Sequence, residues 1–363
     1  MTSQTYLVIA AAALVFIVIF QIAKASEYVS VLKGEEKAKQ QNNRINAFLL
    51  LGFMIIGFIG VWYCNDQLYK TTLFPQGSAS VEGEEIDRMF MMTTAITGLV
   101  FVITQFLLFF FAWKYQAKEG KKAFYFPHNN KLEVIWTVVP AIFLTVLVVF
   151  GLKFWFRITS DAPENALKVE IIGKQFGWIM RYPGKDKDFG KTSVKAISDE
   201  KSNPLGQLFE DNSELKLKAD KANFDDVVTT QTMYVVKGRP VHLIIHSRDV
   251  IHDVGLNHFR MKMDAVPGIP TTLWFTPKYT TKEMKERTGN ENFAYEISCD
   301  QMCGNGHYSM KGIIEVVTQE EFDIWMAKQK PNYWAAYPDK EPKAPAAADT
   351  TKTSNATAAV LKP

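Results

Sequence analysis

Four residues that could bind a soft metal ion lie within one twelve-residue stretch of this chain. They are two cysteines, a histidine and a methionine: Cys299, Cys303, His307 and Met310. Thiolate and imidazole ligands together select copper or zinc, and a thioether favours copper. Two glycines in the same stretch let the backbone turn between the donors. The spacing therefore predicts a soft-metal site, with copper favoured over a structural zinc ion. For the two cysteines alone, the alternatives are a disulfide or a buried pair of thiols.

The elements that must position these residues fall into two halves. The chain has 363 residues, which is enough for two domains. Its mean hydropathy is −0.06, but the long apolar runs are concentrated in the first 160 residues. The net charge of +3 is too small to indicate a nucleic-acid partner. We predict two N-terminal spans with their loops (1–88), a transmembrane hairpin (89–158), an extracytoplasmic domain (159–337) and a disordered tail (338–363).

Four apolar stretches are long enough to cross a bilayer as helices, which takes about 20 residues. They cover about residues 6–22, 45–64, 90–111 and 134–156. No Lys or Arg precedes the first stretch, so it lacks the basic region of a signal peptide. We therefore predict that all four are retained membrane spans.

The charges between the spans predict their orientation. The segments after the first and third spans are rich in Lys and Arg, whereas the segment after the second is rich in Glu and Asp. By the positive-inside rule, the two basic segments lie in the cytoplasm. Both termini and everything after residue 156 then lie outside. We therefore predict an integral protein of a bacterial inner (cytoplasmic) membrane with a periplasmic domain.

The second half of the chain has the pattern of a β protein. Six short runs, 168–172, 233–236, 241–246, 271–275, 293–298 and 312–317, are typical of strands. Several short strands separated by Gly and Pro predict an all-β sandwich or barrel. The charged stretch 184–223 is predicted to lie outside the sandwich. A helix with Phe322, Trp325 and Met326 on one face is predicted after the last strand, and the residues after 337 are predicted to be disordered.

The cysteine stretch needs one more strong ligand, and the histidines outside it are the candidates. His128 is predicted to lie on the cytoplasmic side of the membrane. His242 and His246 share one face of a strand, where structural or surface roles are expected. His252 follows the end of that strand, and His258 comes six residues later. Because loops at one end of a sandwich converge, either His252 or His258 could reach the cysteines.

Four motifs together resemble cytochrome c oxidase subunit II. Residues 247–252 (SRDVIH) followed by 299–310 (CDQMCGNGHYSM) resemble its dinuclear copper (CuA) centre. Residues 132–140 (LEVIWTVVP) resemble its second transmembrane helix, and residues 173–178 (GKQFGW) and 264–268 (DAVPG) resemble two further motifs. The resemblance covers about residues 90–330 in the family's order, so the first two spans and the tail lie outside it.

The resemblance implies an α-helical membrane anchor that carries an all-β, cupredoxin-like sandwich. In the family, two thiolates bridge two copper ions, two histidines are terminal ligands, a thioether is a weak axial ligand and a backbone carbonyl completes the set. The resemblance implies that Cys299 and Cys303 are the bridging thiolates and that His252 and His307 are the terminal ligands. It implies that Met310 is the weak axial ligand and that Gln301 supplies the backbone carbonyl. The resemblance thus selects His252 over His258. Because shared thiolates delocalise one electron over two metals, such a site changes little on reduction and transfers electrons fast.

Three residues depart from the family's pattern. Gln301 stands where many members have a glutamate that also binds magnesium, so a magnesium ion at the interface with the catalytic subunit loses that ligand. Phe176 stands where members have an exposed tryptophan that receives the electron, and either Phe176 or Trp178 is expected to take this role. Arg248 takes a position that is often acidic, and the soluble half is nearly neutral, so a basic cytochrome c would be steered only weakly. We expect a tethered cytochrome c or one held in a supercomplex.

Glu133, at the start of the fourth span, has two interpretations. A carboxylate in the first turn of a helix is favoured by the helix dipole. In the family, a glutamate at this place lies at the cytoplasmic mouth of a proton-uptake pathway that leads into the catalytic subunit. The predicted topology places Glu133 on that side of the membrane.

The function implied is that of the electron-accepting subunit of a respiratory cytochrome c oxidase. Such a subunit takes electrons one at a time from reduced cytochrome c and relays them to haem in catalytic subunit I, where oxygen is reduced to water. The chain has no Cys-x-x-Cys-His motif that would attach a c-type haem. One alternative is a structural subunit of a quinol oxidase, which keeps the fold but lacks the copper ligands. Another is a membrane-anchored copper carrier, which would leave residues 132–140 unexplained.

Overall fold

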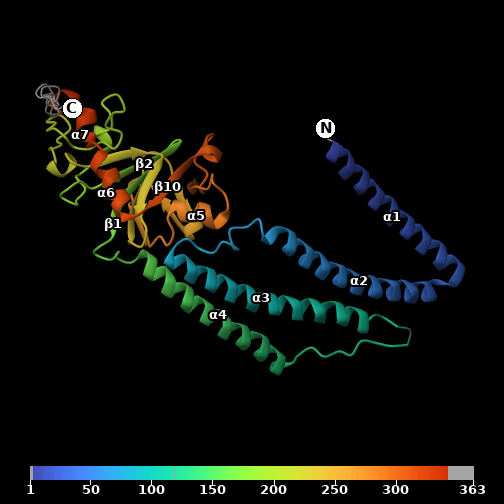
Figure 1. Cartoon of the computed structure of the whole chain (residues 1–363). Coiled ribbons are helices and arrows are strands. Elements are labelled where there is room, and N and C mark those ends of the chain that lie inside the picture. The colour runs from blue at the N-terminus through green and yellow to red at the C-terminus, as the bar shows by residue number, and fades with distance from the viewer. Residues whose placement is uncertain (1–2, 119, 342–363) are drawn as a thin grey trace, which may run out of the picture. The chain divides into compact units, whose positions relative to one another are not determined.

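The computed structural model of the chain describes residues 3–118 and 120–341 (Figure 1). The chain divides into two compact units. The helical unit comprises Met1–Asp161 and Asn257–Met261, and the sandwich unit comprises Ala162–Leu256 and Lys262–Pro363. Residues 342–363 of the predicted disordered tail lie outside the described residues.

The helical unit contains the four apolar stretches as four long helices. They are α1 (Ser3–Lys33), α2 (Glu35–Tyr69), α3 (Val81–Lys114) and α4 (Asn130–Thr159). All four are long and apolar enough to cross a membrane, so the prediction of four helical spans is confirmed by length and composition. Each helix extends beyond the apolar stretch predicted from the sequence, because polar first and last turns add to it.

Side-chain caps and ring contacts explain how these helices begin and pack. The Ser80 hydroxyl accepts a hydrogen bond from the Gly83 amide (2.9 Å) at the start of α3. The Asn129 side chain accepts one from the Leu132 amide (3.2 Å) at the start of α4. Both residues satisfy amides that a helix terminus leaves without a partner. Helices α2 and α3 pack through two ring pairs, Phe53–Phe109 and Phe58–Phe101, with centroids 6.0 and 6.3 Å apart.

The sandwich unit consists of two five-stranded sheets, in the strand orders β3-β2-β1-β5-β8 and β4-β10-β9-β6-β7 (Figure 1). The strands are β1 (Leu167–Lys174), β2 (Gly177–Tyr182), β3 (Val227–Thr230), β4 (Thr232–Val236), β5 (Val241–Ser247), β6 (His252–Leu256), β7 (Met261–Ala265), β8 (Thr271–Phe275), β9 (Tyr295–Cys299) and β10 (Lys311–Val317). Most neighbours are antiparallel, but β1 and β5 are parallel, as are β10 and β4. Fully buried aliphatic side chains such as Val169, Leu243 and Ile297 form the core. The predicted all-β sandwich is therefore confirmed.

Up to the end of β10, four strands and one helix were missed from the sequence. Strands β2 and β6 are buried at every position, so they lack the alternation of polar and apolar residues that marks a half-exposed strand. Strand β3 has only four residues, and β7 was missed although its five residues alternate between apolar and polar. The missed helix is α5 (Thr281–Thr288). Thr280 and Glu283 form a capping box at its start, a signal that the sequence contains.

After the last strand, the structure has the predicted helix and two short elements that were not predicted. Helix α6 (Gln319–Lys328) follows β10. It buries Phe322, and Trp325 stacks on Tyr234 with a ring-centroid distance of 4.3 Å. Two short elements follow, α7 (Asn332–Ala336) and the 3-10 turn η5 (Pro338–Lys340). The η5 turn lies within the stretch predicted to be disordered, so that prediction began too early.

The charged excursion is anchored to the sandwich by one buried arginine. In residues 184–223, all of which are described, the only regular elements are two 3-10 turns, η1 (Val194–Ala196) and η2 (Lys221–Asn223). Arg181, on β2, donates to the carboxylates of Glu170 (2.9 Å) and Asp226 (2.9 Å), the side chain of Asn223 (2.9 Å) and the Gly190 carbonyl (2.6 Å). The arginine is 1% exposed, so this network closes the excursion without leaving a buried charge uncompensated.

Candidate metal centre

Two neighbouring strands and one loop position the candidate ligands. Strand β9 ends at Cys299, and β6, which begins at His252, pairs with it so that Val254 lies opposite Cys299. The loop that follows β9 turns through η4 (His307–Ser309) and ends at Met310, just before β10. This pairing carries His252 to the cysteine loop from 47 residues away along the chain.

All six predicted donors meet around the two thiols. The Cys299 and Cys303 sulfurs are 3.8 Å apart, far longer than the roughly 2.05 Å of a disulfide, and both cysteines are free. The Cys299 sulfur lies 3.7 Å from His252 Nδ1 and 3.3 Å from the Gln301 carbonyl oxygen. The Cys303 sulfur lies 3.6 Å from His307 Nδ1 and 3.8 Å from Met310 Sδ. Each thiol therefore has its own imidazole, and the two thiols share the middle of the site.

The structure brings His252, and not His258, to the sulfurs. The ligand atoms of His252, Cys299 and Cys303 all lie within 4.8 Å of one another. His258 lies in the 3-10 turn η3 (Asn257–Phe259), which belongs to the helical unit. Its carbonyl oxygen accepts a hydrogen bond from the Ala79 amide (2.8 Å). The choice that the residues alone left open is thus made by the pairing of β6 with β9.

Asp249 orients the His252 ring and was not identified from the sequence as a site residue. Its Oδ1 lies 2.8 Å from His252 Nε2, which leaves Nδ1 to face the Cys299 sulfur. Its Oδ2 accepts from the Gln175 amide (2.8 Å). Burial acts to raise the pKa of Asp249, but the hydrogen bonds from Gln175 and His252 outweigh it and lower the pKa. A carboxylate behind a metal-binding histidine is a recurrent arrangement. The only sequence signal was an aspartate three positions before the histidine.

The chemistry of the site favours a bound cation. Cys299, Cys303, Met310 and His252 are 8%, 4%, 1% and 0% exposed. Burial, together with the neighbouring Cys299 thiol, raises the pKa of Cys303 to about 11. Two thiolates held together in a buried site would repel each other, so both ionise only when a metal ion compensates their charge. The donor set of two sulfurs, two imidazoles, a thioether and a carbonyl fits a soft metal such as copper.

Phe176 and Gln175 contact the loop of residues 300–310, which we call the ligand loop, from the outside. Gln175 Nε2 donates to the Cys303 carbonyl at 2.6 Å. The Phe176 ring packs against the two loop glycines: a Cβ at Gly306 would lie 2.5 Å from its Cγ, and a Cβ at Gly304 would lie 3.0 Å from its Cζ. Gly304 also has φ +133°, which other residues rarely adopt. The glycines are therefore needed for this aromatic ring to lie against the loop.

The two aromatic candidates for receiving an electron differ in exposure. Phe176 is 40% exposed, whereas Trp178 is only 1% exposed. The Trp178 ring meets the His252 ring edge-on, with centroids 6.1 Å apart. Trp178 therefore lies against a candidate ligand but is too buried to contact an electron-donor protein, whereas Phe176 is accessible to one. Further exposed apolar side chains come from the loop between β5 and β6 and the loop between β9 and β10: Val250, Ile251, Met302 and Tyr308.

Glu133 is remote from these residues in the chain and belongs to the helical unit. It lies in the first turn of α4, which Asn129 caps. The side chain is exposed, and among the described residues it forms no ion pair. The local structure therefore agrees with a first-turn carboxylate and leaves the side chain accessible.

Comparisons with known proteins match both halves of the chain. The family model "Cytochrome C oxidase subunit II, transmembrane domain" matches residues 68–154, and "Cytochrome C oxidase subunit II, periplasmic domain" matches residues 167–317. The "Alternative cytochrome c oxidase subunit 2" of Bradyrhizobium diazoefficiens is 32% identical over 246 residues, covering 68% of this chain and 80% of that protein. The "Cytochrome c oxidase subunit 2" of Cereibacter sphaeroides is 26% identical over 256 residues, covering 70% and 79%.

Among solved structures, the chain is similar to the periplasmic domain of subunit II of cytochrome oxidase of Bradyrhizobium japonicum. The match covers 46% of this chain and 95% of that structure, with 22% identity and a TM-score of 0.30. Helix α1 and all but the last residues of α2 precede the matched region. Two family models in chain order, and a relative matched over most of its length, show that this chain belongs to the cytochrome c oxidase subunit II family, with two additional N-terminal helices.

Proposed function

We propose that this chain is the electron-accepting subunit of a respiratory cytochrome c oxidase. Its sandwich unit would hold a dinuclear copper (CuA) centre, accept electrons from cytochrome c and relay them to haem in the catalytic subunit, where oxygen becomes water. The observation that carries this proposal is the convergence of six donors around two thiols whose sulfurs are 3.8 Å apart. A quinol oxidase subunit would not need these donors, and a copper carrier would not need the transmembrane match.

The residues of the site divide the work of holding the metal. Cys299 and Cys303 would hold the copper ions as thiolates, and loading would release the proton of Cys303, because burial raises the pKa of this thiol to about 11. Copper ions held by these residues would supply one-electron redox chemistry. His252, beside Cys299, and His307, beside Cys303, would be the imidazole ligands, and Met310 and the Gln301 carbonyl would be the weaker donors. Gln301 has no carboxylate, so no magnesium ion is assigned to it.

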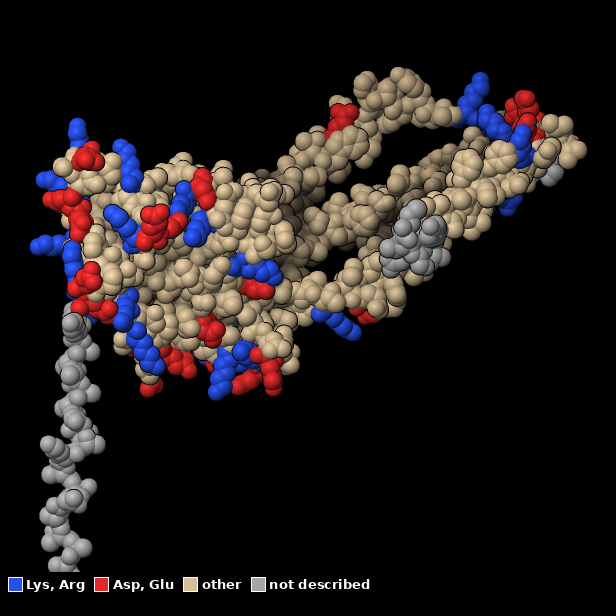
Figure 2. Space-filling view, turned by 90° about the horizontal axis from the view of Figure 1, so that it is seen from above, with Lys and Arg blue, Asp and Glu red and all other residues tan. Residues whose placement is uncertain are grey.

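Phe176 is proposed as the residue through which the electron arrives. It is the aromatic side chain that both contacts the ligand loop and reaches the surface. The exposed apolar residues of the same loops would surround the docking point. Acidic and basic side chains are interspersed over the visible face of the sandwich unit (Figure 2). Since a mixed surface steers a basic cytochrome c weakly, the donor is proposed to be tethered or held in a supercomplex.

The full-length chain, purified in detergent without the catalytic subunit and loaded with copper, tests the proposal. It should bind two copper ions and give a mixed-valence EPR signal split by both copper nuclei, and reduced cytochrome c should reduce it in stopped-flow mixing. The Phe176→Ala variant should keep the EPR signal but be reduced at least about 10-fold more slowly, because the exposed aromatic contact is lost.

The matched control is Tyr308→Ala, which removes an exposed ring from the loop between β9 and β10. Its reduction rate should fall less than that of Phe176→Ala. A single copper ion with splitting from one nucleus would refute the dinuclear centre. Equal rates for Phe176→Ala and the wild type would refute the role of Phe176 while leaving the centre intact.

The membrane orientation and Glu133 complete the proposal. The family and the helices make this a membrane-anchored protein with a periplasmic domain. We place it in the bacterial inner membrane with both termini outside, on the charge pattern of the loops. Glu133 then lies at the cytoplasmic end of α4, where an accessible carboxylate can take up protons for the catalytic subunit.

Replacing Glu133 by alanine should slow the turnover of the assembled oxidase several-fold without changing the rate at which cytochrome c reduces the copper centre. A proton-uptake role predicts this separation because the electron and the proton arrive on opposite sides of the membrane. Glu36→Ala, which removes an exposed first-turn carboxylate of α2, is the control for a purely structural effect. Unchanged turnover in Glu133→Ala would leave only the helix-dipole interpretation.

A further inference from the structure

A basic cavity of about 680 Å³ lies within the helical unit, between α2 and the C-terminal end of α3. Its lining residues come from two short stretches: Lys37, Gln40, Gln41, Arg44 and Phe48 of α2, and Trp113, Lys114, Gln116, Ala117 and Lys118 at the end of α3. The volume is within the range of small-molecule sites. The α2 side of the cavity precedes the region that matches the subunit II family, so the additional helix creates this site.

The cavity has an excess of positive charge. Lys37, Arg44, Lys114 and Lys118 line it, and among the described residues none of the four forms an ion pair. The two nearest carboxylates in α2, Glu35 and Glu36, are not lining residues. Four cations around one cavity, with no carboxylate among its described lining residues, favour an anionic occupant.

The walls of the cavity are suited to a ligand with an apolar part. Phe48 is 53% exposed, and the half-buried Trp113 packs against Phe110 with a centroid distance of 6.0 Å. Asn43 Nδ2 lies 3.4 Å from the Ala117 carbonyl oxygen, which joins α2 to the end of α3 beside the cavity. The cations thus stand next to exposed aromatic surface rather than in open water.

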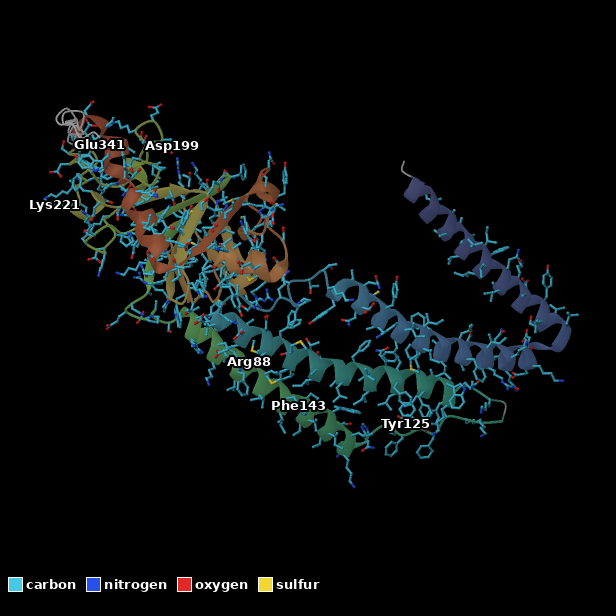
Figure 3. All side chains as sticks on the ribbon, in the orientation of Figure 1. Arg88, Tyr125, Phe143, Asp199, Lys221 and Glu341 are labelled. Atoms are coloured by element: carbon cyan, nitrogen blue, oxygen red, sulfur yellow. The ribbon has the colours of Figure 1, made fainter. Side chains whose placement is uncertain are left out.

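The position along the helices places the cavity at the level of the lipid headgroups. Arg44 is the last charged residue before the apolar run of α2, and Lys114 is the first after the apolar run of α3. The chain between α3 and α4 then exposes three consecutive rings, Phe124–Phe126, and Tyr125 is 85% exposed (Figure 3). Charged side chains, basic and acidic, gather at this end of the helices, whereas the middle of the helices is uncharged (Figure 2). Aromatic rings beside lysines are typical of a membrane–water interface.

We propose that this cavity binds the phosphate headgroup of an anionic phospholipid, with the acyl chains lying along Phe48 and the apolar parts of α2 and α3. The bound lipid would link the additional helix α2 to the hairpin helix α3 by bridging Arg44 and Lys114. A free inorganic anion would use the same cations, but it would gain nothing from the aromatic wall. The proposal concerns a lipid site of the helical unit and does not depend on the copper centre.

Native mass spectrometry of the assembled oxidase, titrated with phosphatidylglycerol, tests this site. Each cation near the membrane surface strengthens binding of an anionic lipid about five-fold, so the double variant Arg44→Gln/Lys114→Gln should bind phosphatidylglycerol roughly 25-fold more weakly. Lys39→Gln, which removes an exposed charge of the same helix outside the cavity, should change the affinity less than about two-fold. Neutral phosphatidylcholine with the same acyl chains should bind wild type and double variant equally.

Several outcomes would overturn the proposal. Unchanged phosphatidylglycerol affinity in the double variant would do so, as would an equal loss in Lys39→Gln. Inorganic phosphate that competes at the same concentration as the lipid would make this a simple anion site. A wild-type oxidase that takes up no phosphatidylglycerol would show that another subunit fills the cavity. If the double variant does not assemble, Lys118→Gln, outside α3, should still show about a five-fold loss.

Discussion

Replacing His252 by glutamine is expected to abolish the mixed-valence copper signal of the full-length chain. His252 Nδ1 lies 3.7 Å from the Cys299 sulfur, and its other nitrogen is held by Asp249, whereas His307 lies beside Cys303. Glutamine has nearly the volume of histidine and limits the cavity left at this fully buried position. Copper content by mass spectrometry and the EPR spectrum measure the result.

The matched control is His258→Gln, six residues along the chain. This histidine belongs to the helical unit, whereas all six donors belong to the sandwich unit. The variant should bind copper as the wild type does and keep the signal split by both nuclei. Loss of the signal in His258→Gln with retention in His252→Gln would reverse the ligand assignment. Far-UV circular dichroism of both variants separates loss of metal from loss of fold.

Replacing Arg181 by methionine is expected to destabilise the sandwich unit by about 3–5 kcal/mol, because it leaves buried carboxylates without their cation. Arg181 is 1% exposed, and Asp226, its partner, is fully buried. The side chain also holds the Gly190 carbonyl and Asn223, so the excursion loses its attachment as well. Urea titration of the full-length chain in detergent, followed by near-UV circular dichroism, measures the change.

The pH dependence of this variant identifies the cause. Burial raises the pKa of Asp226 to about 6, although Arg181 acts to lower it. Without Arg181 this pKa rises further above the value of about 3.9 in the unfolded chain. The folded variant then binds a proton that the unfolded chain releases, so its stability falls as the pH rises between those two pKa values. The deficit relative to wild type should therefore be smaller near pH 5 than near pH 8.

Lys237→Met is the control for loss of a charge at the surface. Lys237 pairs with Glu283, and both side chains are about two-fifths exposed, at 39% and 40%. A pair of this kind contributes less than about 1 kcal/mol. Equal deficits in the two variants, or a deficit in Arg181→Met that does not vary with pH, would contradict the assignment of Arg181 as the anchor of the excursion.

Features that depend on composition and local spacing could be predicted from the sequence. The four helical spans followed from the length of their apolar runs, because a bilayer requires about 20 apolar residues wherever they occur in a chain. The sandwich followed from short β-rich runs, and the soft-metal loop followed from donors that are close together in the chain. Strands β2 and β6 were missed because a strand buried at every position has no alternation to detect.

The tertiary structure decided what depends on residues far apart in the chain. Spacing alone could not choose between His252 and His258, since both follow the same strand; the pairing of β6 with β9 brings His252 to Cys299. Spacing could also not predict that Asp249 lies behind His252, that Phe176 packs on the ligand loop, or that carboxylates surround Arg181. Local sequence determines which donors are present. Strand register, a long-range hydrogen-bonding pattern, determines which of them meet.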